Sequence, residues 1–312
     1  MTHVFVHEVG TRDGLQSVPT FVPTELKKRW CSAEFRAGVR EIEVCSFVPA
    51  KLIPQFADAA EVVRHALTIE GLTVAVLVPN MKGAELALQH GVHKINYVIS
   101  ASESHNRANV RRSTEESALD FERIVDLCRA QPLAARPKIV GGISTALGCT
   151  IEGKVAEESV RRLALRLVTA GADELILADT VGYADPAAVR RLFAAVKSDI
   201  GEVPVTAHFH DTRGLGLANV LAALDVGVRA FDASLGGLGG CPYAPGASGN
   251  ISTEDLVFML DSMGLETGVD IHALLGMRAE ITTLLGDQPY HGAIARAGLP
   301  KGYQGHPART AS

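Results

Sequence analysis

Short runs of β-branched and aliphatic residues recur along the chain, separated by longer stretches that mix apolar and charged positions. Each run is bounded by glycine, proline or polar residues and has the length of a single β-strand. The pattern predicts eight strands, at residues 4–9, 41–46, 73–78, 94–99, 138–144, 174–179, 205–210 and 230–235.

The intervening stretches carry apolar residues at spacings of three and four, which is typical of helices with one buried face. The predicted helices are residues 24–37, 57–67, 82–90, 115–130, 155–170, 186–199 and 217–226. Four of the stretches end at a glycine, where a left-handed capping conformation costs least: Gly38, Gly91, Gly171 and Gly227.

This regular alternation of strands and helices predicts an α/β fold with parallel strands and helical crossovers. Eight such units match a TIM (β/α)8 barrel better than a doubly wound sheet. A further apolar stretch at 271–285 predicts an additional C-terminal helix packed on the barrel, and residues 1–286 are expected to form the barrel with this helix. We expect residues 287–312 to form a C-terminal extension with a mobile tail from Gly302 onward.

Composition and charge narrow the possible partners. The net charge of −5 and the pI near 6.1 argue against a nucleic-acid surface. No apolar run reaches the roughly 18 residues of a membrane helix, and residues 1–8 are too short and polar for a signal peptide. The five cysteines are odd in number, widely spaced and lack a CxxC pair, which predicts free thiols in the cytoplasm.

Polar residues concentrate where the predicted strands end, which is where TIM barrels build their active sites. The first strand leads to Glu8, Arg12 and Asp13, the second carries Glu43 and Ser46, and the sixth ends at Asp179. The seventh ends in His-Phe-His-Asp at 208–211, and the eighth leads into a glycine-rich loop at 236–250.

His208 and His210 are the clearest candidates for chemistry. Side chains two positions apart on a strand point to the same face, so both imidazoles can converge on one point in the barrel mouth. A metal ion would suit that point, with added oxygen ligands from Asp13 and Asn250 favouring Mg²⁺ or Mn²⁺ and leaving zinc open. The alternative is two core histidines held by hydrogen bonds, and Asp211 fits either an outer hydrogen-bonding role or a loop cap.

Several longer motifs resemble the HMG-CoA lyase family of metal-dependent TIM-barrel lyases. They are Glu-Val-Gly-Thr-Arg-Asp-Gly-Leu-Gln at 8–16, Ile-Glu at 42–43 with Ser-Phe-Val at 46–48, Val-Pro-Asn-Met-Lys-Gly at 78–83, and Asp-Thr-Val-Gly at 179–182. His-Phe-His-Asp-Thr at 208–212 also fits. The most specific is Gly-Gly-Leu-Gly-Gly-Cys-Pro-Tyr-Ala-Pro-Gly-Ala-Ser-Gly-Asn at 236–250, followed by Thr-Glu-Asp at 253–255.

The resemblance implies a role for each matching residue. It implies that the metal ligands are Asp13, His208, His210 and Asn250, that Arg12, Glu43 and Cys241 are catalytic, and that Arg12, Gln16 and Asp179 contact substrate. It further implies a divalent cofactor, Mg²⁺ or Mn²⁺, an acyl-CoA substrate and a homo-oligomer, with a dimer favoured. Leucine degradation and ketone-body metabolism would be its setting.

The implied reaction is a retro-Claisen cleavage of 3-hydroxy-3-methylglutaryl-CoA to acetyl-CoA and acetoacetate. A metal would stabilise the deprotonated 3-hydroxyl, Arg12 the developing enolate, and Cys241 would deliver a proton. Departures from the family pattern at 17–19, 102–106 and 150–153 leave another branched 3-hydroxyacyl-CoA as an alternative substrate. A Claisen-condensing enzyme of the same superfamily and a binding barrel without catalysis are the two rival functions.

Overall fold

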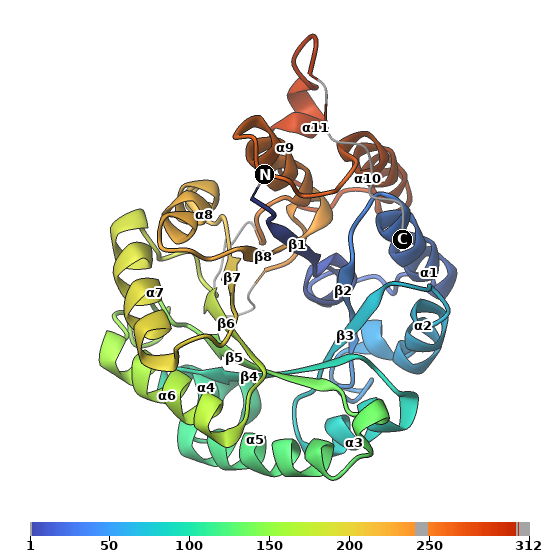
Figure 1. Cartoon of the computed structure of the whole chain (residues 1–312). Helices are drawn as coiled ribbons and strands as arrows, with labels where there is room; N and C mark the ends of the chain where they lie inside the picture. Colours follow the sequence, from blue (N-terminus) through green and yellow to red (C-terminus); the bar gives the residue numbers. More distant parts are fainter. Residues whose placement is uncertain (1, 241–248, 304, 306–312) are drawn as a thin grey trace.

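Eight parallel strands close into a barrel in the computed structural model, which describes residues 2–240, 249–303 and 305. Each strand pairs with the next in the chain, and the last pairs with the first (Figure 1). The strands are β1 (Phe5–Glu8), β2 (Glu41–Ser46), β3 (Thr73–Leu77), β4 (Lys94–Ser100), β5 (Lys138–Ser144), β6 (Glu174–Asp179), β7 (Val205–Phe209) and β8 (Ala230–Ala233). The predicted TIM barrel and its eight strands are confirmed.

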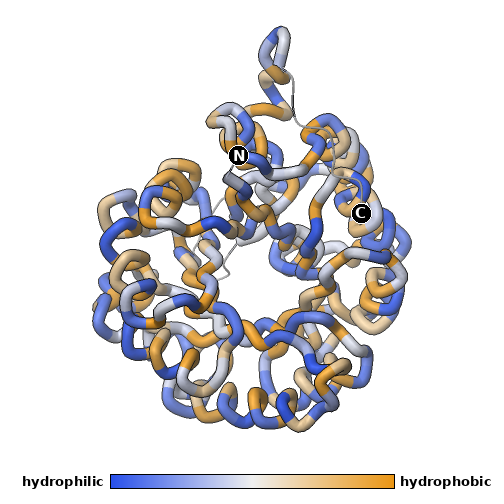
Figure 2. Tube along the Cα trace, in the orientation of Figure 1, coloured by the Kyte–Doolittle hydropathy of each residue, from blue (hydrophilic) through white to orange (hydrophobic). Residues whose placement is uncertain are grey.

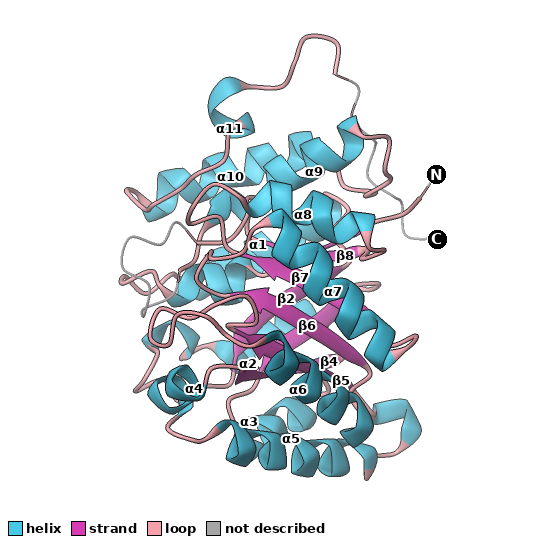
Figure 3. Cartoon of the chain, turned by 90° about the vertical axis from the view of Figure 1, so that its left-hand side faces the viewer, coloured by secondary structure: helices cyan, strands magenta, loops and turns pink. Residues whose placement is uncertain are grey.

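Helices surround the barrel and cover its outer face (Figure 3). The helices between strands are α1 (Thr24–Arg36), α2 (Ala59–Ala66), α3 (Met81–His90), α4 (Glu103–Val110), α5 (Thr114–Arg129), α6 (Glu157–Ala170), α7 (Pro186–Ile200) and α8 (Gly216–Asp225). After β8 come α9 (Thr253–Ser262), α10 (Ile271–Leu285) and α11 (Ile294–Ala297). Short turns are η1 (Gly10–Gly14), η2 (Pro54–Phe56), η3 (Leu133–Ala135) and η4 (Leu235–Gly237).

The helix ends follow from local sequence. Asp185 caps α7 by accepting hydrogen bonds from two backbone N–H groups of its first turn, and Pro186 occupies the first helical position. Gly91 and Gly171 end α3 and α6 with φ values of 70° and 114°, as their positions in the sequence predicted.

Besides the single-turn helix α11, two helices were not predicted from the sequence. The segment that forms α4 is mostly polar and lacks a clear apolar face, yet Ser102 starts a helix there by accepting a hydrogen bond from His105 N–H. Helix α9 closes the eighth strand–helix unit and begins in the same way at Ser252. Both helices therefore depend on a capping serine, which a search for apolar periodicity does not detect.

The apolar core lies between the sheet and the outer helices, and Figure 2 shows hydrophobic and hydrophilic positions on each outer helix. The lumen of the barrel, in contrast, contains charged side chains. Lys94 of β4 forms ion pairs with Glu41 of β2 and Glu174 of β6, and strands that are not neighbours can make such contacts only across the lumen. A layer of paired charges thus occupies the inside of the barrel.

The residues after β8 complete the barrel wall and extend beyond it. Helix α10 packs against α1 and α9, and Asp255 accepts hydrogen bonds from the first N–H groups of the segment that forms α11. The tail expected to be mobile, from Gly302 onward, lies outside the described residues except for Gly302, Tyr303 and Gly305. The division at residue 286 remains a prediction. None of the described helices has the length and apolar character that crossing a membrane requires.

Candidate active site

The turn after β1 carries two of the predicted site residues, Arg12 and Asp13. It is a single π-helical turn, η1 (Gly10–Gly14), in which the last three backbone N–H groups all donate to the carbonyl oxygen of Val9. π-Helical turns are rare overall, and many of those that occur lie at functional sites. Here the turn brings both side chains over the mouth of the barrel, where the carboxyl ends of the strands meet.

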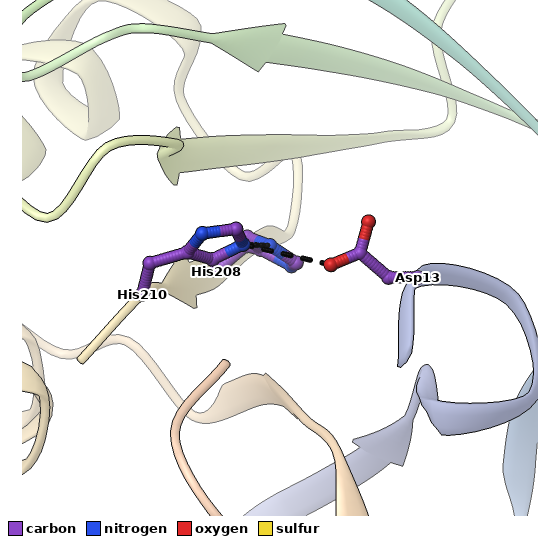
Figure 4. A group of neighbouring side chains, drawn as sticks. All are labelled: Asp13, His208 and His210. Carbon is purple, nitrogen blue, oxygen red and sulfur yellow. Dashed lines mark hydrogen bonds and ion pairs between the residues drawn. The ribbon is translucent and has the colours of Figure 1, made fainter. Parts of the chain in front are cut away.

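Asp13, His208 and His210 converge on one point, as Figure 4 shows. Their candidate ligand atoms all lie within 4.8 Å of one another, and all three residues are buried. The Nε2 atoms of the two histidines are 3.1 Å apart, and Asp13 Oδ2 lies 3.5 Å from His210 Nε2. The spacing of two along the strand therefore places both imidazoles on the same face, as the sequence predicted.

The charge of Asp13 suits a metal ligand. Burial alone would raise its pKa, but the positive charge of Arg12 and the nearby imidazoles outweigh burial and hold the pKa well below its usual range. The carboxyl group is therefore ionised at neutral pH, with an oxygen facing the two histidines.

Asn250 reaches the same cluster from the far end of the glycine-rich loop. Its Nδ2 donates to Asp13 Oδ2 at 2.7 Å and to the Leu238 carbonyl oxygen at 2.9 Å. Its Oδ1 is buried and has no hydrogen-bond partner among the described residues. A buried acceptor without a partner is rare, and a cation would satisfy it. Two imidazole nitrogens, a carboxylate oxygen and an amide oxygen together fit a divalent metal ion.

Arg12 lies beside this cluster and is held by two carboxylates. Its Nε donates to Glu43 Oε2, and its NH1 donates to Asp13 Oδ1. Glu43 in turn accepts a 2.8 Å hydrogen bond from Asn96 Nδ2. Burial raises the pKa of Glu43 although Arg12 opposes the shift. The sequence left open whether Glu43 is catalytic or an ion-pair partner of Arg12, and the ion pair is present.

The other predicted residues take different positions. Asp179 is fully buried, and its two oxygens accept hydrogen bonds from the backbone of Tyr183 and Ala184, so the side chain holds the loop after β6. Gln16 is half-buried just beyond η1. Cys241 lies outside the described residues. Substrate contacts by Asp179 and Gln16, and catalysis by Cys241, remain predictions.

Asp211 acts as a loop cap, one of the two roles that the sequence allowed. Its Oδ1 accepts a 2.7 Å hydrogen bond from Gly216 N–H at the start of α8. The ligand set therefore draws on His208 and His210 without this neighbouring carboxylate.

Glu8 does not face the barrel mouth, contrary to its place among the strand-end candidates. Its side chain is fully buried behind the sheet, where it accepts hydrogen bonds from Gly10 N–H, Leu235 N–H and Thr253 Oγ1. The strand register turns Glu8 outward toward α1 and α9, so the residue holds the ends of β1 and β8 together.

Three lumen residues next to the site were not identified from the sequence: His7, Asn96 and Asp232. Asp232 Oδ2 lies 3.1 Å from His208 Nδ1, and Asn96 supports Glu43. A polar side chain inside a predicted strand could have pointed to these residues, because a buried polar side chain needs a hydrogen-bond partner.

Comparison with known proteins agrees with this geometry. The sequence model of the HMGL-like family matches residues 3–281. The chain belongs to this family. It is 42% identical over 283 residues to hydroxymethylglutaryl-CoA lyase YngG of Bacillus subtilis, covering 91% of this chain and 93% of the relative. It is also 42% identical to the mitochondrial hydroxymethylglutaryl-CoA lyase of Rattus norvegicus, covering 87% of this chain and 82% of that protein.

Solved structures lead to the same family. An HMG-CoA lyase from Acinetobacter baumannii, in complex with coenzyme A and 3-methylmalate, superposes with a TM-score of 0.90 at 42% identity, covering 98% of each chain. The carboxyl transferase domain of Rhizobium etli pyruvate carboxylase, at 19% identity and a TM-score of 0.68, shares the fold alone. The resemblance to HMG-CoA lyases and the assignment as a lyase, both predicted from sequence motifs, are confirmed.

Proposed function

We propose that this chain cleaves 3-hydroxy-3-methylglutaryl-CoA to acetyl-CoA and acetoacetate. The observation that carries the proposal is the convergence of Asp13, His208, His210 and Asn250 beside the Arg12 guanidinium, at the mouth of a barrel that belongs to this family. A binding barrel without catalysis would not need buried acid, base and cation side chains focused on one point.

The cleavage requires two charges to be stabilised. The 3-hydroxyl loses its proton, the bond between C2 and C3 breaks, and its electrons pass to the thioester as an enolate, which takes a proton at C2. When bound by the four-residue cluster, a divalent ion supplies positive charge that lowers the pKa of the 3-hydroxyl and orients the substrate. Arg12 supplies a permanent cation for the enolate oxygen, a contact worth about 3 kcal/mol for a donor of the oxyanion-hole type.

The surrounding residues position these groups. Glu43 and Asp13 each accept a hydrogen bond from the Arg12 guanidinium and fix it from two sides, and we assign Glu43 a part in catalysis beside Arg12, as the family motif implies. We assign the final proton transfer to the Cys241 thiol and substrate contacts to Gln16 and Asp179, as the family motif implies. Asp179 also holds the loop after β6, because its oxygens accept hydrogen bonds from Tyr183 and Ala184 N–H.

We further propose that the metal is Mg²⁺ or Mn²⁺, because the cluster has two oxygen donors and no cysteine within the described residues. Elemental analysis of protein purified without added metal tests this, and a stoichiometric content of zinc would overturn it. A cytoplasmic homo-oligomer, with a dimer favoured, completes the proposal, and light scattering of the purified chain gives its mass.

The decisive experiment mixes the metal-loaded protein with 3-hydroxy-3-methylglutaryl-CoA and measures acetyl-CoA and acetoacetate together. Both products should form in equal amounts, and chelation should abolish them. If neither forms but a longer branched 3-hydroxyacyl-CoA is cleaved, the reaction class stands and the substrate assignment is wrong. If only condensation of acetyl-CoA with a keto acid is seen, the chain is a synthase instead.

A further inference from the structure

Asp232 lies in β8 between two imidazoles that belong to the neighbouring strands. In the barrel register it pairs with His7 of β1 on one side and with His208 of β7 on the other. Its Oδ2 lies 3.1 Å from His208 Nδ1, and its Oδ1 lies 3.5 Å from His7 Nδ1. The residue is only 5% exposed, so each carboxylate oxygen faces one imidazole with little access for water.

The contact at Nδ1 decides which ring nitrogen of His208 is left to bind an ion. An ionised carboxylate only accepts hydrogen bonds, so Nδ1 of His208 carries the proton in the pair with Asp232. The Nε2 atom then keeps its lone pair, and this atom lies 3.1 Å from Nε2 of His210 in the cluster with Asp13. A carboxylate behind a ligating histidine commonly fixes the ring orientation in this way.

We infer that Asp232 is a positioning residue for the metal centre, holding His208 in the tautomer and orientation that present Nε2 to the ion. The inference rests on the proposed function, because it requires Asp13, His208 and His210 to hold a divalent ion. Asp232 takes no part in bond breaking. Its effect is on metal affinity, and on turnover only through the metal.

The lumen beneath the site holds Asp232 in place from the opposite side. His7 Nδ1 lies 3.7 Å from Glu41 Oε1 as well as 3.5 Å from Asp232. Glu41 accepts a 2.7 Å hydrogen bond from Lys94, which also pairs with Glu174. A continuous series of charged and polar contacts therefore runs from the ligand His208 down through the barrel, and replacing His7 should weaken the metal site less than replacing Asp232.

The test measures metal affinity without using activity. Mn²⁺ is titrated into the full-length, metal-stripped protein, and binding is followed by calorimetry or by the electron paramagnetic resonance signal of free Mn²⁺. Asp232→Ala should raise the Mn²⁺ dissociation constant by about 10- to 100-fold, as is typical for loss of such a partner. Asp232→Asn, which keeps an acceptor oxygen without the charge, should give a smaller loss.

A matched control is available on the outer wall. Asp120 of α5 is buried to a similar extent, with 3% exposure, and pairs with Arg112 and Arg123 away from the mouth of the barrel. Asp120→Ala should lower thermal stability but leave the Mn²⁺ dissociation constant unchanged. Equal affinity in Asp232→Ala and the unaltered protein would overturn the inference while leaving the proposed function intact.

A second measurement needs no variant and so does not depend on the folding of Asp232→Ala. In ¹⁵N spectra of the Mg²⁺-loaded protein, His208 should carry its proton on Nδ1, and a proton on Nε2 would contradict the inference. If the unaltered protein binds neither Mg²⁺ nor Mn²⁺, the inference fails together with the metal assignment of the proposed function. If Asp232→Ala binds Mn²⁺ with unchanged affinity, the inference fails and the proposed function stands.

Discussion

Asn250 donates a hydrogen bond of 2.7 Å from Nδ2 to Oδ2 of Asp13, although 237 positions separate them in the sequence. The contact joins the turn after β1 to the far end of the glycine-rich loop. Gly239 makes room for it, because a Cβ at this position would lie 2.4 Å from Asn250 Nδ2 and 3.2 Å from Asp13 Oδ2. The absence of a side chain at Gly239 therefore allows Asn250 and Asp13 to make this contact.

Gly239→Ala should disrupt the metal site. The added methyl group displaces Asn250, so we expect at least a tenfold weaker affinity for Mn²⁺ in a calorimetric titration. Gly264→Ala is the matched control, since Gly264 also has a positive φ, of 75°, but open space around its missing Cβ. Both positions have a φ that side chains rarely adopt, 127° at Gly239 and 75° at Gly264, so both variants incur backbone strain, of about 1–3 kcal/mol. If the two variants bind Mn²⁺ equally well, the close packing at Gly239 does not matter for the site.

Replacing His208 or His210 by alanine should remove the metal without unfolding the barrel. Each substitution deletes one of the nitrogen donors of the cluster, whereas the apolar core between sheet and helices is untouched. Elemental analysis should show metal content near zero, and circular dichroism should show an unchanged helical signal. Full metal occupancy in both variants would refute the ligand assignment.

Arg12→Lys should lower kcat almost as much as Arg12→Ala. Arg12 uses Nε and NH1 to contact two different carboxylates, Glu43 and Asp13, and a lysine ammonium cannot reproduce this planar fork. Loss of a transition-state donor of this kind costs about 10²- to 10³-fold in rate. The metal affinity of Arg12→Lys is the control and should change little, because the variant keeps a positive charge beside Asp13. Near-normal turnover by Arg12→Lys would show that only a diffuse positive charge is needed.

The strands and the histidine pair could be predicted because both depend on local patterns. Buried parallel strands appear as short apolar runs, and the spacing of His208 and His210 fixes their common face whatever surrounds them. The motif at 8–16 likewise located Arg12 and Asp13. The conformation of η1 could not be foreseen, since a single π-helical turn leaves no periodic pattern.

The supporting residues depend on closure of the barrel, which no local pattern reveals. Asp232 meets His7 only because β8 pairs with β1, and Lys94 meets Glu41 and Glu174 only across the lumen. The outward direction of the Glu8 side chain could not be predicted for a related reason. One short strand does not indicate which of its two faces points into the barrel.

Alkylation of the native protein should modify Cys241 before the other four cysteines. Those four are at most 2% exposed, and burial raises the pKa of Cys31 and Cys45 strongly and that of Cys128 to about 12. Mass spectrometry after partial treatment with iodoacetamide, compared with residual activity, identifies the reactive thiol. Inactivation that follows modification of Cys45 or Cys149 would contradict a catalytic role for Cys241.

Glu34 should make the stability of the barrel depend on pH. Its carboxyl group is fully buried behind β1, where it accepts a 2.6 Å hydrogen bond from Trp30 Nε1 and interacts electrostatically with the buried carboxyl group of Glu8. Burial, together with the neighbouring charge of Glu8, raises the pKa of Glu34 well above its ordinary value of 4.5. Glu8 accepts hydrogen bonds from Gly10, Leu235 and Thr253, which favour its ionised form, so Glu34 is the carboxyl group of the pair that more readily keeps a proton.

Glu34→Gln should therefore gain stability relative to the unaltered protein as the pH rises. Because the pKa of Glu34 is raised in the folded protein, the unfolded chain loses this proton at a lower pH, and between the two pKa values raising the pH favours unfolding by up to about 1.4 kcal/mol per pH unit. Glutamine keeps a donor and an acceptor but does not ionise, so its variant lacks this penalty. Urea unfolding of both proteins at pH 5, 7 and 9 measures the difference in free energy of unfolding, which should be more in favour of the variant at pH 7 than at pH 5. Glu34→Ala, which loses the Trp30 hydrogen bond, should be less stable than Glu34→Gln at every pH. A difference between glutamine and glutamate that stays constant from pH 5 to 9 would mean that Glu34 is ionised in the folded barrel.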